Sequence, residues 1–264
     1  MFGSRGSRVN KMFGLYARPV DRGEALSRLR ALGLSDEDAQ TLFAHFDAAE
    51  QAGKEGHGHS RIPWLETQEF DPIARPVRLE QAESFERWSG NGGLGYLAMA
   101  SICRATLAAP PDRARLVVAE GCLPTGSLGY WARSLADGGL IALIAATSPR
   151  RLPAPTGGMP LTGTNPLAIA IPSSDGRPIV ADVSMGAVTH GDVIAGRATP
   201  DELVPFGGPL AHKAFALAVG LELFVTALAG DEHGAVILVA QPEHDPVPGF
   251  RGLADGIRLP GDRA

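Results

Sequence analysis

The sequence predicts a soluble α/β protein, and three observations support that prediction. Apolar runs of strand length, at residues 115–119, 140–146 and 235–240, alternate with segments of helical period. Turn formers separate these segments, since 33 glycines and 21 prolines are spread over 264 residues. Hydrophobic residues make up 44% of the chain, which is enough for one or two domains with a sizeable core.

The composition excludes several classes of partner and location. The net charge of -5 and the lack of a clustered basic face argue against nucleic-acid binding. The most apolar stretch, residues 214–229, is interrupted by Glu222 and Thr226, so we expect no membrane insertion. Cys103 and Cys122 lie in apolar surroundings without metal-ligand spacing. They indicate reduced core thiols and a cytoplasmic location.

The N-terminal part of the chain is predicted to be helical. Residues 1–20 are a basic tail without the apolar run of a signal peptide, and we expect this tail to be flexible. A short amphipathic helix is expected over residues 23–34. Ser35 then offers an N-cap, with acids in the first turn, for a second helix over residues 39–52.

A glycine motif further along resembles a dinucleotide-binding fingerprint. GNGGLG at residues 90–95 matches G-x-G-x-x-G, and a helix is expected over residues 94–107. The fingerprint requires a strand directly before it, whereas residues 66–89 are polar and end in ESFERWS. We therefore expect a loop there and no Rossmann unit.

The middle of the chain has the order of elements that is typical of α/β proteins. Strands over residues 115–119 and 140–146 flank a helix over residues 125–136, which predicts a parallel βαβ unit. Two further strands, residues 165–171 and 178–183, are joined by the turn-rich PSSDG and suit a hairpin.

The last predicted elements are a long buried helix over residues 211–229 and a strand over residues 235–240. We expect one unit over residues 21–264. Its three parts are a helical region, an α/β region and a short C-terminal tail, over residues 21–90, 91–240 and 241–264.

The segment GHGHSRIP at residues 56–63 is the most informative in the chain. His57 precedes Arg61 by four residues, among small and rigid residues. An imidazole exchanges a proton near neutral pH, and a guanidinium binds a carboxylate with two parallel hydrogen bonds. The pair therefore suits a small acidic substrate. The segment alone is equally a Gly-rich turn with ordinary polar residues.

This segment resembles the S-H-G-x-x-R-x-P motif of the type 2 malate/L-lactate dehydrogenases. Five further segments resemble family motifs in the same order, over about residues 20 to 240. They are NGGLG at 91–95, GYWA at 129–132, LTGTNPLA at 161–168, DVS at 182–184 with Gly191 beyond, and KAFALA at 213–218 with Glu222 downstream.

The resemblance implies a fold, a cofactor and a reaction. The family has a non-Rossmann α/β fold, in which a mixed sheet has flanking helices and an N-terminal helical region. Its members use NAD or NADP, without a metal, to reduce 2-oxo acids and cyclic imino acids. They are commonly homodimers whose site is completed at the interface.

Three residues can carry the chemistry of such a reduction. His57 suits the proton donor, because its ordinary pKa is close to working pH. Asp182, at the end of a strand, is expected to orient the imidazole and to favour its protonated form. Arg61 is the expected clamp for the substrate carboxylate. Singly, Asp182 could merely cap its strand, and Arg61 could pair with Glu66 on the surface.

The resemblance assigns further binding residues. Thr164 and Asn165 offer neutral donors and acceptors to the substrate. Ser148, Ser184 and Asp182 are expected near the nicotinamide. Lys213 is expected near the cofactor phosphates or the substrate, although a lysine at the start of a helix is equally a solvated side chain.

Departures from the family pattern leave the activity open. Gly56 stands where the family has a serine that completes a Ser-His-Asp relay, and Pro124 stands where the family has a histidine facing the substrate. Ala214 and Ala216 replace two family glycines. The segment between Arg197 and Gly207 is shorter than in typical members.

Three hypotheses follow from these matches and departures. The first is an active reductase in which His57 alone donates the proton, and the second is a degenerate paralogue that binds a ligand or partner without turnover. The third is a metal site on His57 and His59, which lacks an obvious third ligand.

Overall fold

The structure is a computed structural model that describes residues 20–262. Apart from Val20, the tail expected over residues 1–20 lies outside that range. The α-helices are α2 (Arg22–Ala31), α3 (Asp36–Gln51), α4 (Arg61–Leu65), α5 (Gly95–Ala108), α6 (Leu128–Asp137), α7 (His190–Ile194), α8 (Ala211–Ala229) and α9 (Val247–Leu253). The short 3-10 turns are η1 (Glu55–His57), η2 (Pro200–Glu202) and η3 (Gly208–Leu210).

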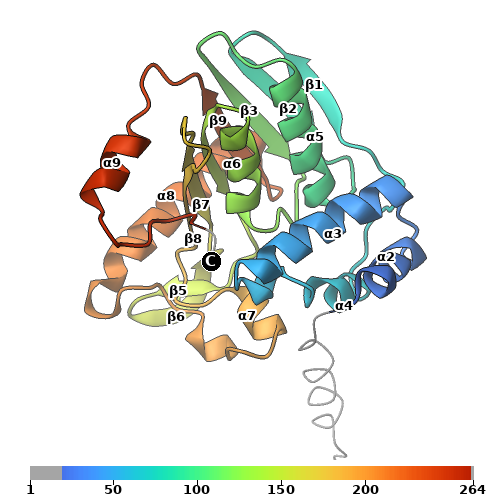
Figure 1. Cartoon of the computed structure of the whole chain (residues 1–264). Helices are drawn as coiled ribbons and strands as arrows, with labels where there is room; N and C mark the ends of the chain where they lie inside the picture. Colours follow the sequence, from blue (N-terminus) through green and yellow to red (C-terminus); the bar gives the residue numbers. More distant parts are fainter. Residues whose placement is uncertain (1–19, 263–264) are drawn as a thin grey trace, which may run out of the picture.

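A seven-stranded mixed sheet forms the centre of the molecule, in the order β1-β2-β3-β9-β4-β7-β8. Its strands are β1 (Val77–Gln81), β2 (Phe85–Ser89), β3 (Ala114–Glu120), β4 (Ile141–Ala146), β7 (Leu167–Ile171), β8 (Ile179–Val183) and β9 (Ala235–Ala240). A separate hairpin pairs β5 (Leu152–Ala154) with β6 (Gly157–Thr162). Helices α5 and α6 pack against one face of the sheet, and α8 covers the other (Figure 1). The predicted α/β fold with a mixed sheet is therefore confirmed.

The two predicted N-terminal helices are present as α2 and α3. The Asp21 side chain caps α2 by accepting a hydrogen bond from Gly23 N at 2.9 Å. The hydroxyl of Ser35 caps α3 by accepting one from Asp38 N at 3.2 Å. Phe46 on α3 is fully buried in the main core, where it meets Tyr96 of α5 edge to face. The apolar face of α3 thus fixes the position of the chain that follows it.

The segment predicted as a loop over residues 66–89 contains a hairpin instead. Strands β1 and β2 pair antiparallel, and β2 pairs parallel with β3. The polar composition hid β2, because its buried face carries Glu86. That carboxylate is satisfied by Arg115 at 3.2 Å and by the indole N–H of Trp88 at 2.8 Å. A buried charge with such partners is compatible with a strand.

The expectation that no strand precedes GNGGLG was therefore wrong. Strand β2 directly precedes GNGGLG, α5 follows it, and β3 returns parallel to β2, which is a βαβ unit. The turn is made by Asn91 and Gly92, both at positive φ (52° and 79°). The sheet as a whole still differs from a doubly wound one, because β9 runs antiparallel between β3 and β4.

The predicted βαβ unit of β3, α6 and β4 is parallel, but its two strands are not neighbours. Each pairs antiparallel with β9, which lies between them. Helix α6 begins at Leu128 and not at Thr125, because Gly126 adopts a positive φ of 75° and keeps the preceding residues in a loop. The hairpin of β7 and β8 is present as predicted.

The strand directions bring the predicted site residues to one edge of the sheet. Strands β2, β3, β4 and β8 all end at this edge, and β9 and β7 begin there. Ser148 follows β4, Thr164 and Asn165 precede β7, and Asp182 and Ser184 lie at the end of β8. The side chains from three separate segments therefore come together at this edge.

Helix α8 differs from the buried helix expected from the sequence. Val225 and Ala229 pack under β3, β4 and β9, together with Val118, Ala145 and Val236. The opposite side is open, with Leu217, Leu223 and Phe224 exposed by 52%, 65% and 45%. Within residues 20–262, the helix over residues 208–229 is the one segment long and apolar enough to cross a membrane. The side of α8 that carries Val225 and Ala229 is buried because it packs on the sheet.

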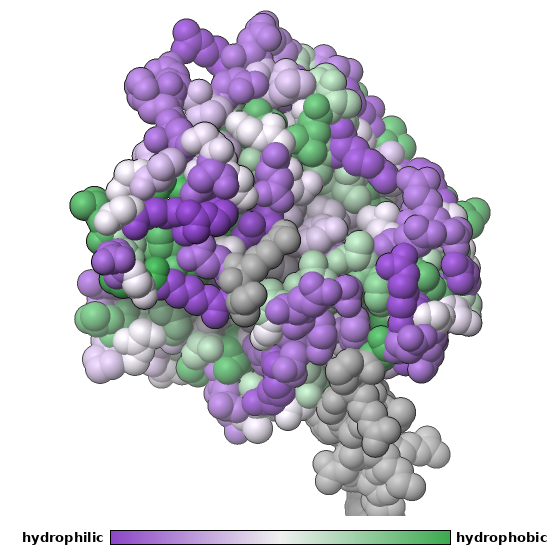
Figure 2. Space-filling view, viewed as in Figure 1, coloured by the Kyte–Doolittle hydropathy of each residue, from purple (hydrophilic) through white to green (hydrophobic). Residues whose placement is uncertain are grey.

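The C-terminal residues predicted as a short tail contain α9 and rejoin the domain. Val180 N of β8 donates a hydrogen bond to Pro260 O at 3.0 Å. Arg251 of α9 pairs with Asp262 at 2.8 Å. Helix α7 and the β5–β6 hairpin were also missed, because each is too short to show a period. The face seen in Figure 2 is mostly hydrophilic, with its hydrophobic side chains in separate patches.

Candidate active site

The histidine segment lies where α3 ends and the chain turns toward the end of β8. Gly53, at a φ of 71°, ends α3, and η1 and α4 then carry His57 and Arg61. The Nδ1 atom of His57 is buried and has no hydrogen-bond partner within residues 20–262. Burial, followed by the charge of Arg61, lowers the pKa of His57 to about 3, and the charge of Asp182 opposes this shift. The imidazole is therefore neutral near pH 7.

The backbone packing at Gly56 explains the absence of a serine there. A Cβ at this position would lie 2.8 Å from the backbone atoms Asp192 N and Gly191 C. A Cβ on Gly191 would in turn lie 2.1 Å from Gly56 O. The two glycines thus let η1 and α7 approach to backbone contact. No larger residue fits at position 56 while α7 stays in place.

Arg61 is buried without a carboxylate. Arg61 is only 7% exposed, and its Nε donates a hydrogen bond to Gly56 O at 2.7 Å. The guanidinium lies 4.9 Å from the ring centre of Trp64. Among the described residues no carboxylate lies within 4.0 Å of it, and Glu66 pairs instead with Arg28 at 2.7 Å. The alternative that Arg61 pairs with Glu66 is therefore wrong.

Asp182 lies close to His57 but is held by other partners. Its Oδ2 accepts from Lys54 Nζ at 2.5 Å and from Ser127 Oγ at 2.8 Å. These contacts keep the pKa of Asp182 below its ordinary value, although burial opposes the shift. No hydrogen bond joins Asp182 to His57 in the described part of the chain. The expected orientation of the imidazole by this carboxylate is thus absent from the structure.

Lys54 and Ser127 are site residues that the sequence did not reveal. Lys54 caps η1, and His57 N donates to Lys54 O at 2.8 Å. Residues three apart on a 3-10 turn project to the same side, so this spacing was a usable signal for Lys54. Ser127, just before α6, had no such signal, because its approach to β8 depends on tertiary packing.

A second imidazole, His45, lies under the loop that carries Pro124 and Ser127. His45 is fully buried on α3, and its Nε2 accepts from Ser127 N at 3.0 Å. Its ring stacks 5.2 Å from Trp131 and meets Tyr96 at 5.0 Å. Burial lowers the pKa of His45 to about 3. The neutral ring therefore holds the 124–127 loop, which contains Pro124 at the position where the resemblance led us to expect a histidine.

Asn165 is fully occupied within the protein. It is buried at a positive φ of 28°, and its Nδ2 donates to Glu222 Oε2 at 2.6 Å and to Ala218 O at 3.1 Å. Its Oδ1 accepts from Ser148 N at 3.2 Å. The amide thus ties α8 to the strand ends of β4 and β7. These contacts favour a structural role over direct contact with a substrate.

The other predicted binding residues differ in their surroundings. Thr164 is partly buried, and its main-chain oxygen accepts from Met185 N at 2.7 Å. Ser184 donates to Gly186 O at 3.3 Å, which keeps it at the same edge. Lys213 is exposed in the first turn of α8 and has no ion pair within residues 20–262.

His59 turns away from His57. Its Nδ1 accepts from Val20 N at 3.1 Å, its ring stacks 5.8 Å from Phe43, and Nε2 lies 3.5 Å from Asp47. In the described residues, no three His, Cys, Asp or Glu side chains gather as a metal would require. Cys103 and Cys122 are buried free thiols, and burial raises both pKa values to about 12.

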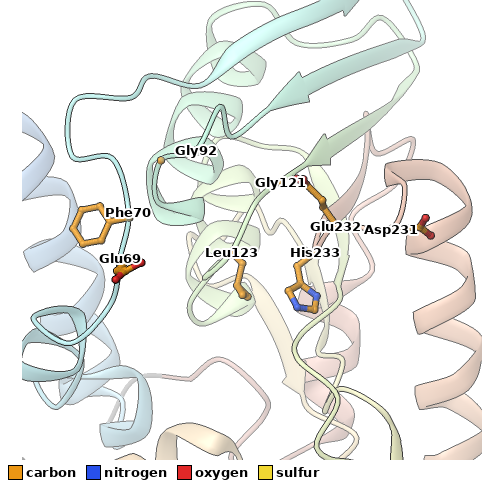
Figure 3. Close-up of a pocket in the computed structure, with 9 residues that line it drawn as sticks. Glu69, Phe70, Gly92, Gly121, Leu123, Asp231, Glu232 and His233 are labelled. Carbon is orange, nitrogen blue, oxygen red and sulfur yellow. The ribbon is translucent and has the colours of Figure 1, made fainter.

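The same sheet edge also borders a cleft beyond the ends of β2 and β3. It has a volume of about 360 Å³ and is lined by Glu69, Phe70, Gly92, Gly93, Gly121, Leu123, Asp231, Glu232 and His233 (Figure 3). Three of these side chains are carboxylates, all of them exposed to solvent. Such a lining repels phosphates and carboxylates.

The sequence is similar to a set of characterised reductases. The malate/L-lactate dehydrogenase family profile matches residues 24–201. A Delta(1)-pyrroline-2-carboxylate/Delta(1)-piperideine-2-carboxylate reductase of Pseudomonas syringae pv. tomato is 31% identical over 232 residues, which is 75% of this chain and 66% of that protein. A (2R)-3-sulfolactate dehydrogenase (NADP(+)) of Chromohalobacter salexigens is 29% identical, over 80% of this chain and 71% of that protein. The chain thus spans just under two thirds of the first of these relatives.

Solved structures agree with the sequence match. The delta1-piperideine-2-carboxylate reductase from P. syringae superposes with a TM-score of 0.75 at 26% identity, covering 94% of this chain and 92% of that one. A dehydrogenase from Sinorhizobium meliloti has a TM-score of 0.76 at 23% identity, covering 96% and 88%, which shows the shared fold. By family profile and fold together, the chain belongs to the malate/L-lactate dehydrogenase family.

Proposed function

We propose that the protein is a nicotinamide-dependent reductase of small 2-oxo acids or cyclic imino acids. The observation that carries the proposal is Arg61, a guanidinium that is 7% exposed and lacks a carboxylate within 4.0 Å in residues 20–262. A buried cation without a directly paired carboxylate is costly unless a ligand supplies one. A substrate carboxylate at Arg61 would lie beside His57, as the reaction requires.

The residues at this edge fit a nicotinamide cofactor, either NAD or NADP. Among residues 20–262, cations without carboxylate partners and the unpaired Nδ1 atoms of His57 and His190 suit a ligand that is anionic and accepts hydrogen bonds. Ser148 and Ser184 would hold the nicotinamide end, with Asp182 beside it, and Lys213 would meet the phosphates. When bound, the cofactor supplies the hydride. The acidic cleft in Figure 3 is unsuited to its phosphates.

His57 provides the proton that completes the reduction. With a pKa of about 3 it is neutral in the free protein, and Arg61 is the second cause of that low value after burial. A carboxylate bound to Arg61 neutralises this charge, so substrate binding raises the pKa of His57 and draws a proton to it. In the reverse direction the neutral imidazole is already the base.

The remaining edge residues position this pair. Lys54 and Ser127 fix the Asp182 carboxylate near the imidazole, where its charge favours the protonated ring. Asn165 holds the strand ends through Glu222 and Ser148. Thr164 is the neutral group left to meet the substrate.

A second candidate function is a paralogue that binds a ligand or partner without turnover. It is favoured by the capture of Asp182 by Lys54, which leaves His57 without a hydrogen-bonded acid. Fluorescence titration with NADH and with NADPH separates the two functions. The reductase requires binding of at least one cofactor below millimolar concentration, and a chain that binds neither cannot be the reductase.

The reductase itself is tested with a panel of 2-oxo acids and cyclic imino acids, monitored by nicotinamide absorbance. For the best substrate, His57→Ala should lower kcat roughly 10²- to 10⁴-fold, as removal of a general acid does. The His59→Ala variant is the matched control, since that ring faces Phe43 and Asp47. Equal turnover in wild type and His57→Ala would refute the assigned role.

We further propose a cytoplasmic homodimer. The exposed apolar side of α8, with Leu217, Leu223 and Phe224, is an apolar surface of the kind that subunit interfaces bury. Sedimentation velocity should give twice the chain mass, and Leu223→Glu with Phe224→Glu should give the monomer.

A further inference from the structure

A continuous chain of hydrogen bonds leads from His45 on α3 to the segment that carries His57. His45 Nε2 accepts from the main-chain N–H of Ser127 at 3.0 Å. The hydroxyl of Ser127 donates to Asp182 Oδ2 at 2.8 Å, and Lys54 Nζ donates to the same oxygen at 2.5 Å. Lys54 O then accepts from His57 N at 2.8 Å. The chain joins α3, the loop before α6, the end of β8 and the start of η1.

Ser127 is placed to control Asp182 and not its own helix. It is the N-cap residue of α6, where a serine hydroxyl ordinarily accepts a hydrogen bond from the first turn. The Ser127 hydroxyl makes no such bond and is directed to Asp182 instead. Gly129, in the first turn of α6, lies against the same side chain, since a Cβ there would be 2.8 Å from Asp182 Oδ2. The position of the Asp182 carboxylate therefore depends on where α6 begins.

The start of α6 is in turn fixed by the His45 ring. Gly126 has a positive φ of 75°, and the space that a Cβ would take there is filled by the imidazole, with Nε2 2.5 Å from that point. The ring also stacks 5.2 Å from Trp131, whose indole N–H donates to Thr125 O at 2.7 Å. His45 thus holds the backbone before α6 directly at Ser127 and, through Trp131, at Thr125.

The hydrogen bond to Ser127 explains a histidine at this position better than core packing does. His45 is fully buried, and its ring meets those of Phe46, Tyr96, Tyr130 and Trp131. Because Nε2 accepts, the proton of the neutral ring is on Nδ1, which has no partner among residues 20–262. A buried polar atom without a partner is destabilising, so an apolar side chain would suit this aromatic cluster better.

We propose that His45 is a positioning residue for the proposed reduction and acts through Ser127 on Asp182. By accepting the Ser127 N–H, the imidazole fixes the start of α6. The Ser127 hydroxyl and the first turn of α6 then hold the carboxylate where its charge stabilises protonated His57. This inference rests on the proposed function and adds to it a residue that no sequence motif indicates.

Steady-state kinetics of variants along this chain test the role, with the best substrate and the preferred cofactor at saturation. His45→Leu removes the acceptor, and Ser127→Ala removes the hydroxyl. Each should lower kcat for reduction about tenfold, the effect of one lost hydrogen bond, and change KM less than about threefold. His45→Gln, whose amide oxygen can accept the same N–H, should restore most of the loss. The double variant should be no slower than either single variant, because both break the same chain. Losses that multiply in the double variant would overturn the inference.

The pH profile of kcat distinguishes positioning of Asp182 from general damage to the core. The pKa of His57 is lowered by burial, Arg61 and Lys54 and is raised by Asp182 and Asp192. A displaced Asp182 raises this pKa less, so the fall in kcat should move to lower pH in His45→Leu and in Ser127→Ala alike.

Phe46→Leu is the matched control for the pH profile. Phe46 is the fully buried neighbour of His45 on α3 and meets its ring edge to face at 5.7 Å, but it has no part in the chain of hydrogen bonds. Its loss should lower the free energy of unfolding and leave the profile in place. An unchanged profile in His45→Leu would overturn the inference, and so would an equal shift in Phe46→Leu.

NMR of the Asp182 carboxyl carbon separates failure of this inference from failure of the proposed function. The resonance is identified by its loss in Asp182→Asn. If no 2-oxo acid or imino acid is turned over, the proposed function fails, and the resonance still reports the hydrogen bond from Ser127. The inference requires it to move in the same direction in His45→Leu as in Ser127→Ala, and to return toward the wild-type position in His45→Gln. A resonance that His45→Leu leaves in place would refute the inference.

Discussion

At the β4 and β8 end of the sheet edge, two arginines have no carboxylate partner within residues 20–262, whereas at the β2 and β3 end carboxylates line a cleft. Arg61 and Arg151 represent the first end, and Glu69, Asp231 and Glu232 the second. His233 also lines the acidic cleft, and burial lowers its pKa, a shift that Glu222 opposes and Arg151 increases. The sheet edge thus has a cationic end at β4 and β8 and an acidic end at β2 and β3. An anionic substrate is directed to the cationic end.

The largest effect should come from the buried cation. Arg61→Met should lower kcat/KM for the best 2-oxo acid roughly 10²- to 10³-fold, because it leaves the substrate carboxylate without its buried partner. Steady-state kinetics measure this loss. Arg197→Met, whose charge is already paired with Glu55 and Asp192, should change kcat/KM less than about threefold. Similar losses in both variants would show that the unpaired charge at this end has no special role.

The close packing that brings α7 to this end should be the next most sensitive feature. Gly56→Ser places a side chain 2.8 Å from backbone atoms of residues 191 and 192, so it should lower the free energy of unfolding by about 2 kcal/mol. Urea denaturation measures the change. Gly252→Ser is the control, because a Cβ there meets nothing within 4 Å. A Gly56→Ser protein as stable as wild type would contradict the described packing.

The pH dependence of reduction should identify the acid at the cationic end. Because the pKa of His57 is lowered to about 3, the protonated form becomes scarcer as pH rises above that value. The kcat/KM for reduction should therefore fall about tenfold per pH unit between pH 5 and 8, while that for oxidation stays flat. Lys54→Met removes a nearby cation and frees Asp182, so it should raise the pKa of His57 and move the profile to higher pH. A wild-type plateau extending up to pH 6.5 would indicate an unperturbed histidine.

The smallest effect is expected at the acidic end. Glu232→Gln and Asp231→Asn should change kcat/KM for any anionic substrate less than about twofold, because neither carboxylate is placed among the substrate-binding groups. A gain of tenfold or more would mean that the cleft, and not the cationic end, receives the substrate.

The sequence predicted the helices and strands of the molecule better than the ion pairs between its side chains. Local signals such as the cap at Ser35 and the apolar run of β9 located most helices and strands. Strand β2 was missed because Glu86 is paired with Arg115 of β3, far along the chain, in addition to the nearby Arg78 of β1. The open side of α8 was likewise invisible, since composition does not show which apolar residues face solvent.

In the candidate site, likewise, the sequence predicted the residues but not their hydrogen-bond partners. His57, Arg61 and Asp182 were predicted from motifs, and the structure places all three at one end of the sheet edge. The hydrogen bonds of Asp182 to Lys54 and Ser127 were not predictable, because they join residues 128 and 55 positions apart. Motifs therefore identified the groups, and tertiary packing decided their partners.

The position of β9 has a consequence for the order in which the protein can form during synthesis. This strand is central in the sheet but is the last of its strands along the chain, and it joins β1-β2-β3 to β4-β7-β8. Until residues 235–240 leave the ribosome, β3 and β4 each present an unpaired edge, which invites association with other chains. Asp182 and the 124–127 loop are made long before that moment, so the nascent chain has every site residue yet no assembled site.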